Sequence, residues 1–117
     1  MNIDVKWVRK DGVLIVVLNG IIDSSSAPQL QRALESGIGP ADRALLLDFE
    51  QVSFLSSAGL RIFLIFARRF NVPGKQFGVC ALSDPIRNVI TISGFDRFLK
   101  VYNSQAEAVN AFKSGLS

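Results

Sequence analysis

The chain has 117 residues, of which 49% are hydrophobic, so it can bury one core without a disulfide or a metal, and we expect a single domain over residues 1–117. It has no histidine, which excludes a Ser-His-Asp triad and histidine-containing metal sites. Its one cysteine, Cys80, cannot form an internal disulfide, which is typical of proteins of the reducing cytoplasm. The net charge is +3, but the basic residues are scattered and no stretch approaches the roughly 20 apolar residues of a membrane span, so we expect neither nucleic-acid binding nor membrane insertion.

The N-terminal part predicts two strands joined by a tight hairpin. Apolar and polar residues alternate over residues 3–7, Asp11-Gly12 is a typical two-residue turn, and the apolar run 13–18 predicts a strand buried on both faces. Ser24-Ser25-Ser26 and Pro28 then predict a helix whose N-cap is Ser25 or Ser26. The apolar residues at helical spacing in it are Leu30, Ala33, Leu34 and Ile38.

The central part predicts a buried strand over residues 44–49, a short loop and a helix over residues 57–70. One apolar stripe of this helix consists of Leu60, Phe63, Leu64 and Ala67, and Ile62, Ile65 and Phe66 point away from it. The extra apolar side chains have two explanations: a neighbouring element buries the whole helix, or a partner docks on it. The sequence leaves both open.

The C-terminal part predicts a strand over residues 76–82, a helix that starts at Ser83-Asp84-Pro85 and ends at Gly94, an edge strand over residues 98–102 and a last helix. Ser104 is the expected cap of that helix, and its expected inward residues are Ala108, Val109 and Phe112. Two strands followed by alternating helices and strands are typical of an α/β fold. We expect a mixed sheet of about four to five strands, flanked by about four helices on one or both faces.

The serines at the start of the helix 57–70 are the most informative candidates for a site. A serine before a helix is usually a cap, because its hydroxyl accepts a hydrogen bond from a free backbone N–H. The alternative is a phosphoacceptor, because free N–H groups and the positive helix end would stabilise a phosphate on Ser57. Composition favours neither interpretation over the other.

Other polar residues give weaker signals. Asp23, Asp48 and Glu50 belong to no paired-carboxylate, metal-binding or phosphate-loop motif. Cys80 has no basic neighbour that would lower its pKa, so we expect a core residue and no nucleophile. Ser24–Ser26 are cap and loop residues or part of a partner-binding rim. We expect no metal, no other cofactor and no catalytic residue.

Two stretches of the sequence resemble the STAS domain family, whose best-known soluble members are bacterial anti-sigma-factor antagonists. Gly20-Ile21-Ile22-Asp23 followed by Ala27-Pro28 resembles the family's pattern of Gly, two residues, Asp and then Ala-Pro. Residues 45–48 followed by 52–60 resemble its strand, loop and phosphorylation segment, and this second pattern is the more specific one. The resemblance covers nearly the whole chain and implies a sheet flanked by helices, with no cofactor.

The resemblance also implies a switch operated by reversible phosphorylation. The family's phosphorylated residue corresponds to Ser57, with Ser56 as second choice. The unphosphorylated chain would bind an anti-sigma factor that is a serine kinase, and a phosphatase of the PP2C type would reset the switch after phosphorylation. The implied partner-binding residues are Asp23, Ser24, Ser25, Ser56, Ala58, Gly59, Arg61 and Ile62. The chain would thus be a kinase substrate and not an enzyme.

Three residues depart from the family pattern. Ser56 stands where Asp is common, which removes a charge that matters for kinase recognition but keeps the capping ability. Ala58 replaces a common Ser or Thr. Arg61 replaces a common Gly and adds charge to the presumed docking helix, where it is either solvated or in contact with an acidic partner.

Two alternatives stand beside the switch. A STAS protein can act without phosphorylation as a structural or regulatory subunit of a lipid-transport ABC complex, which a stable complex with a transporter ATPase would reveal. A small hydrolase or nucleotide-binding enzyme is disfavoured by the missing histidine and the missing phosphate-binding loop.

Overall fold

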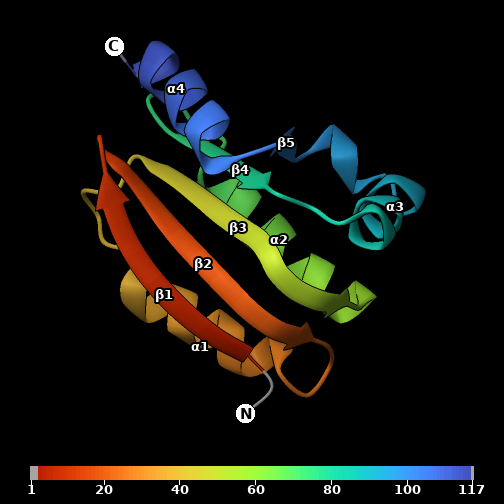
Figure 1. Ribbon diagram of the computed structural model, residues 1–117. Coiled ribbons are helices and arrows are strands. Elements are labelled where there is room, and N and C mark those ends of the chain that lie inside the picture. Colours follow the sequence, from red (N-terminus) through yellow and green to blue (C-terminus); the bar gives the residue numbers. More distant parts are fainter. Residues whose placement is uncertain (1–2, 117) are drawn as a thin grey trace.

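The computed structural model describes residues 3–116. The elements follow in the order β1 (Ile3–Lys10), β2 (Val13–Ile22), α1 (Ala27–Gly37), β3 (Ala44–Leu55), α2 (Ser57–Arg69), β4 (Gln76–Cys80), α3 (Asp84–Ile92), the 3₁₀ helix η1 (Phe95–Arg97), β5 (Lys100–Tyr102) and α4 (Gln105–Leu116) (Figure 1). All the predicted strands and helices are present, and the differences concern their ends.

Within the described residues the strands form one five-stranded sheet in the order β1-β2-β3-β4-β5. β1 is antiparallel to β2, and the remaining pairs are parallel. At the hairpin between β1 and β2, the φ angles of Asp11 and Gly12 are 55° and 80°, and the common type I′ turn requires positive values at both positions. The predicted α/β fold with a mixed sheet is therefore confirmed.

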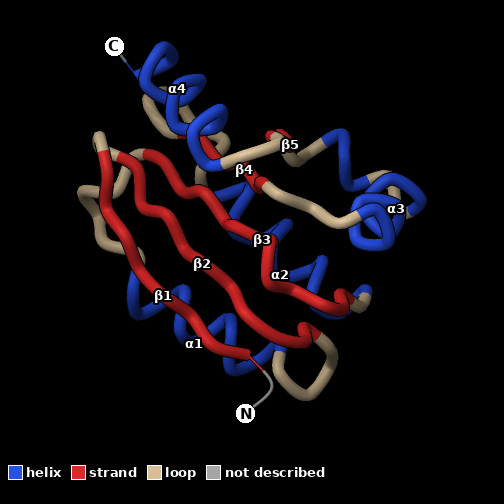
Figure 2. The backbone as a smooth tube through the Cα atoms, viewed as in Figure 1, coloured by secondary structure: helices blue, strands red, loops and turns tan. Residues whose placement is uncertain are grey.

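Helices cover the two faces of the sheet unequally. Of the helices in residues 3–116, α1, α2 and α3 pack on one face, and α4 packs on the other, near β4 and β5 (Figure 2). Successive residues of a strand point to opposite faces, so β2 alternates between the two cores. The core under α4 consists of Val13, Ile15, Ala44, Leu46, Cys80, Ala108, Val109 and Phe112. The predicted burial of the first half of β2 on both faces is confirmed.

β3 is six residues longer than the predicted strand, because its pairing with β2 continues to Leu55. The continuous apolar pattern stops at Phe49. The next residues include Glu50, Gln51 and Ser53, which are exposed because none of the described helices covers them. Two register shifts accompany this second half of β3, which indicates β-bulges. The expected loop between strand and helix is therefore strand, and only Ser56 separates β3 from α2.

The predicted division of α2 into an inner stripe and an outer apolar face was partly wrong. Ile62 and Phe66, expected outside, are 4% and 0% exposed, whereas Leu64, expected inside, is only half-buried. α1 lies alongside α2 and covers the side on which Ile62 lies. Ile65 remains exposed, at 37%. The neighbouring helix therefore accounts for the burial of Ile62, whereas Phe66 belongs to the core on this side of the sheet.

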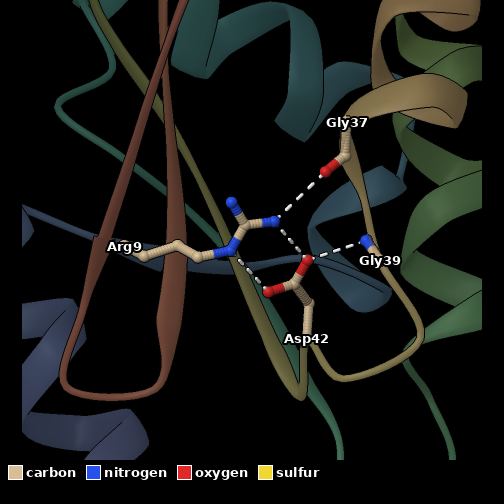
Figure 3. A network of polar contacts seen from close by, with 4 residues as sticks. All are labelled: Arg9, Gly37, Gly39 and Asp42. Atoms are coloured by element: carbon tan, nitrogen blue, oxygen red, sulfur yellow. Dashed lines mark hydrogen bonds and ion pairs between the residues drawn. The ribbon is translucent and has the colours of Figure 1, made fainter.

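A polar contact fixes the connection from α1 to β3 against the β1–β2 hairpin. The Arg9 guanidinium donates two hydrogen bonds to the Asp42 carboxylate, from Nε at 3.0 Å and from Nη2 at 2.9 Å (Figure 3). The Gly39 N–H donates to Asp42 Oδ2 at 2.8 Å, and Arg9 Nη2 also donates to the Gly37 carbonyl at 3.3 Å. Asp42 is buried, and its partners satisfy both carboxylate oxygens.

Candidate functional site

The start of α2 places Ser56 and Ser57 in different environments. Ser56 is the N-cap: its Oγ accepts a hydrogen bond from the Gly59 N–H at 3.3 Å, and its own N–H donates to the Ile22 carbonyl at 2.8 Å. Ser57 is the first residue of the helix and is exposed, and no hydrogen bond to another described residue involves its hydroxyl. The predicted position of Ser57 at the start of a helix is confirmed, and its exposure leaves it accessible to a kinase.

The loop before α1 is shaped by Asp23. Its Oδ1 accepts hydrogen bonds from the N–H groups of Ser25 and Ser26, both at 3.0 Å, and from the Ser25 hydroxyl at 2.7 Å. The hydrogen bond from the Ser25 hydroxyl, followed by that from the Ser26 N–H, holds the pKa of Asp23 below its ordinary value. Asp23 therefore organises the loop through the carboxylate that had been assigned to partner binding.

Ser26 occupies the predicted N-cap position of α1, but its side chain does not cap the helix. Its hydroxyl donates to the Ile21 carbonyl at 2.7 Å and accepts from the Asp23 N–H at 3.0 Å. The side chain is buried, so it holds the loop closed on the end of β2. Ser24 and Ser25 remain exposed.

A groove runs between α1 and α2 beside this loop and has a volume of about 270 Å³. Its lining residues are Ser24, Ala27, Pro28, Gln31, Ala58, Arg61, Ile62 and Ile65. Four of the predicted partner-binding residues, from both segments, thus meet at one surface. The α1 residues of the groove were missed, because their place depends on how α1 packs against α2. In the sequence, Ala27 and Pro28 indicated a helix start and the family pattern, but not a partner-binding surface.

Gly59, also predicted to contact a partner, lies in the first turn of α2 and is buried. A Cβ at this position would lie 2.5 Å from Ile22 Cγ2 and 2.7 Å from Leu55 Cδ1. The missing side chain therefore lets α2 approach β2 and β3 closely, and Gly59 offers no side chain to a partner.

The residues considered for other chemistry are structural. Burial, and then the charges of Asp48 and Glu50, raise the pKa of the Cys80 thiol to about 12. Asp48 is itself buried, and its carboxylate accepts hydrogen bonds from the Glu50 N–H and from the Gln105 amide. Within residues 3–116 no three His, Cys, Asp or Glu side chains form a possible metal site. No helix in this part of the chain is long and apolar enough to cross a membrane.

The sequence model of the STAS domain matches residues 4–108. The chain belongs to the STAS domain family. The anti-sigma factor antagonist BtrV of Bordetella bronchiseptica is 36% identical to it over 106 residues, which make up 91% of each protein. The anti-sigma F factor antagonist of Paenibacillus polymyxa is 24% identical over 110 residues, which make up 93% of this chain and 94% of that protein.

Solved structures of other proteins have the same fold. The crystal structure of an anti-sigma factor antagonist from Mycobacterium paratuberculosis matches with a TM-score of 0.87 and 30% identity, and the match covers 95% of this chain and 94% of that one. A sulfate transporter family protein from Wolinella succinogenes, at 21% identity, has a TM-score of 0.76. Because proteins of different function have this fold, the function has to be argued from the site.

Proposed function

We propose that this STAS chain, over residues 1–117, is an anti-sigma factor antagonist whose binding to an anti-sigma factor is controlled by phosphorylation of Ser57. The observation that carries the proposal is the exposed, unbonded hydroxyl of Ser57 at the start of α2, next to the groove between α1 and α2. The names of the relatives support the antagonist function, since both are named as antagonists of anti-sigma factors.

The proposed partner is an anti-sigma factor that is also a serine kinase. When Ser57 is unphosphorylated, the chain binds this kinase, and the sigma factor is released. Ser57 Oγ then attacks the γ-phosphorus of ATP, the bond to ADP breaks, and the hydroxyl proton passes to a base of the kinase. A PP2C-type phosphatase hydrolyses the phosphoester and resets the switch. The STAS chain is a substrate in both steps.

The proposed docking surface consists of the loop before α1 and the first turns of α2. Among the predicted residues, Ser24, Ser25 and Arg61 are exposed and are available for direct contact. Ala58 and Ile62 line the groove. Asp23, Ser56 and Gly59 support the surface through the hydrogen bonds and the close packing described above.

The phosphate would act mainly on the complex. A phosphoserine carries about −1.5 to −2 charges, which water and the free N–H groups of the helix start can solvate in the free chain. Against a partner surface the phosphate would lose water, and an inadequately paired buried charge costs on the order of 3–5 kcal/mol. Affinity should therefore fall by roughly two to three and a half orders of magnitude.

The test is incubation with the cognate kinase and ATP, followed by mass spectrometry. We expect phosphate on Ser57 in the wild type and none in Ser57→Ala, which should still bind the kinase. Ser56→Ala is the matched control and should still gain phosphate, because it changes the cap and not the acceptor. Phosphate on Ser56 alone would show that Ser56, and not Ser57, is the acceptor. Absence of phosphate from both serines, together with co-purification of a transport ATPase, would favour the structural-subunit alternative.

A further inference from the structure

Arg61 lies on the surface of α2 between Ser57 and the groove. Successive helical residues are rotated by about 100°, so Arg61 is displaced by about 40° from Ser57 and lies one turn along the helix. Ile65, on the groove side, is displaced by about 80° from Ser57. Arg61 is exposed, and its guanidinium has no ion pair or hydrogen bond with any described residue. Arg61 is therefore free to bind an anion on the side of Ser57 or on the side of the groove.

The groove offers one charge in an otherwise uncharged surface. Of the eight lining residues only Arg61 is charged, and Ile62 and Ile65 provide aliphatic surface. The carboxylate of the adjoining loop, Asp23, already binds the N–H groups of Ser25 and Ser26. A partner segment that complements this groove therefore has an apolar side chain, which contacts Ile62 and Ile65, and next to it a carboxylate. That carboxylate accepts a charge-assisted hydrogen bond from Arg61.

We propose that Arg61 has two alternative anionic partners: a carboxylate of the docked anti-sigma factor when Ser57 is unmodified, and the phosphate when Ser57 is phosphorylated. This inference rests on the proposed function and adds a mechanism to it. Phosphorylation then weakens docking in two ways: it places a charge beside the groove, and it takes the groove's single cation away from the partner.

The geometry favours the phosphate in this competition. Side chains four residues apart on a helix are neighbours, and the favourable order has the anion N-terminal to the cation, as with Ser57 and Arg61. A phosphate offers more charge than a carboxylate and can accept two parallel hydrogen bonds from a guanidinium. The phosphate is also held on the same helix, so its effective concentration near Arg61 is high.

The first experiment needs no partner. Phosphoserine is installed at position 57 by genetic encoding, and its second ionisation is followed by ³¹P NMR in the wild type, Arg61→Gln and Arg68→Gln. Arg68 is the matched control, because it is an exposed arginine of α2, three turns from Ser57, without an ion pair to any described residue. We expect Arg61→Gln to lower the acid dissociation constant about two- to fourfold, and Arg68→Gln to change it much less. Equal effects of the two substitutions would overturn the proposal.

The second experiment measures the affinity for the anti-sigma kinase by calorimetry. In the unphosphorylated chain we expect Arg61→Gln to weaken binding about tenfold and Arg68→Gln to have little effect. The loss of affinity caused by phosphoserine 57 should then be smaller in Arg61→Gln than in the wild type. An unchanged loss would contradict the shared role of Arg61. If the kinase neither binds nor modifies the chain, the proposed function fails, whereas the ³¹P comparison still decides whether Arg61 binds the phosphate.

Discussion

The Asp42 carboxylate joins segments that are far apart in the sequence, so its ionisation is coupled to folding. Hydrogen bonding by the Arg9 side chain is the main reason why the pKa of Asp42 lies below its ordinary value of 3.8, and the Gly39 N–H lowers it further against the effect of burial. A carboxyl group whose pKa is lower in the folded than in the unfolded state stabilises the fold above its unfolded pKa. That stabilisation is lost as the pH falls through the folded value.

We therefore predict that Asp42→Ala lowers the free energy of unfolding by about 1–3 kcal/mol at neutral pH, because charge-assisted hydrogen bonds are lost. The difference from the wild type should shrink in acid, beginning near the ordinary pKa of 3.8. Urea denaturation at a series of pH values measures it. Asp4→Ala is the control, since Asp4 is exposed on β1 and forms no ion pair with the described residues. A stability difference that stayed constant down to the lowest pH would show that the Asp42 charge is not responsible.

Individual residues of the site were predictable where the signal is local. Ser57 could be placed at the start of a helix because small hydroxyl residues precede an apolar helical pattern, and Ser56 because it is a good cap. The role of Asp23 could not be predicted in the same way. Its carboxylate folds back onto the loop that follows it, and the sequence does not tell a loop-forming aspartate from one that faces a partner.

At the scale of elements, the close approach of α2 to β2 and β3 depends on Gly59. An alanine in an exposed helix is favoured over glycine by about 1 kcal/mol. At Gly59 we predict the opposite sign, because the added Cβ would overlap Ile22 and Leu55. Gly59→Ala should destabilise the chain by about 1–3 kcal/mol, the usual cost of overpacking. Chemical denaturation measures it, and a stabilised Gly59→Ala variant would contradict this account of the packing.

The order and type of elements could be predicted because turn residues and helix starts are marked locally, as at Asp11-Gly12 and Ser83-Asp84-Pro85. The length of β3 could not, because its second half has an exposed face and lacks a continuous apolar pattern. The inner face of α2 was predicted only in part. Burial of Ile62 depends on α1, a helix separated from α2 in the sequence by the whole of β3.

At the scale of the whole molecule, the described helices cover the two sides of the sheet unequally. The proposed switch lies on the side with three of the described helices, whereas α4 alone forms the other core. Phe112 is the largest α4 side chain in that core, and its ring packs edge-on against Tyr102 at 5.6 Å between centroids. A Cβ at position 78 would lie 2.9 Å from this ring, so Gly78 makes room for it. Cys80 lies buried in the same core and can report on whether α4 is docked.

We predict that Phe112→Ala lowers the free energy of unfolding by about 3–5 kcal/mol, the usual cost of such a truncation. It should also speed the reaction of Cys80 with a thiol reagent, because α4 detaches while the rest of the fold persists. In the wild type the reaction should be slow, since burial leaves the thiol inaccessible and raises its pKa to about 12. The rate is measured by absorbance at low urea concentrations.

Phe66→Ala provides the matched control, since Phe66 is equally buried but lies on the α2 side of the sheet. In Phe66→Ala, Cys80 should react only after global unfolding. The logarithm of the rate should therefore rise steeply with urea concentration, because its slope scales with the surface that unfolding exposes. In Phe112→Ala the opening is local and exposes little surface, so the rate should depend only weakly on urea. The same steep dependence in both variants would show that α4 and the α2 side unfold as one cooperative unit.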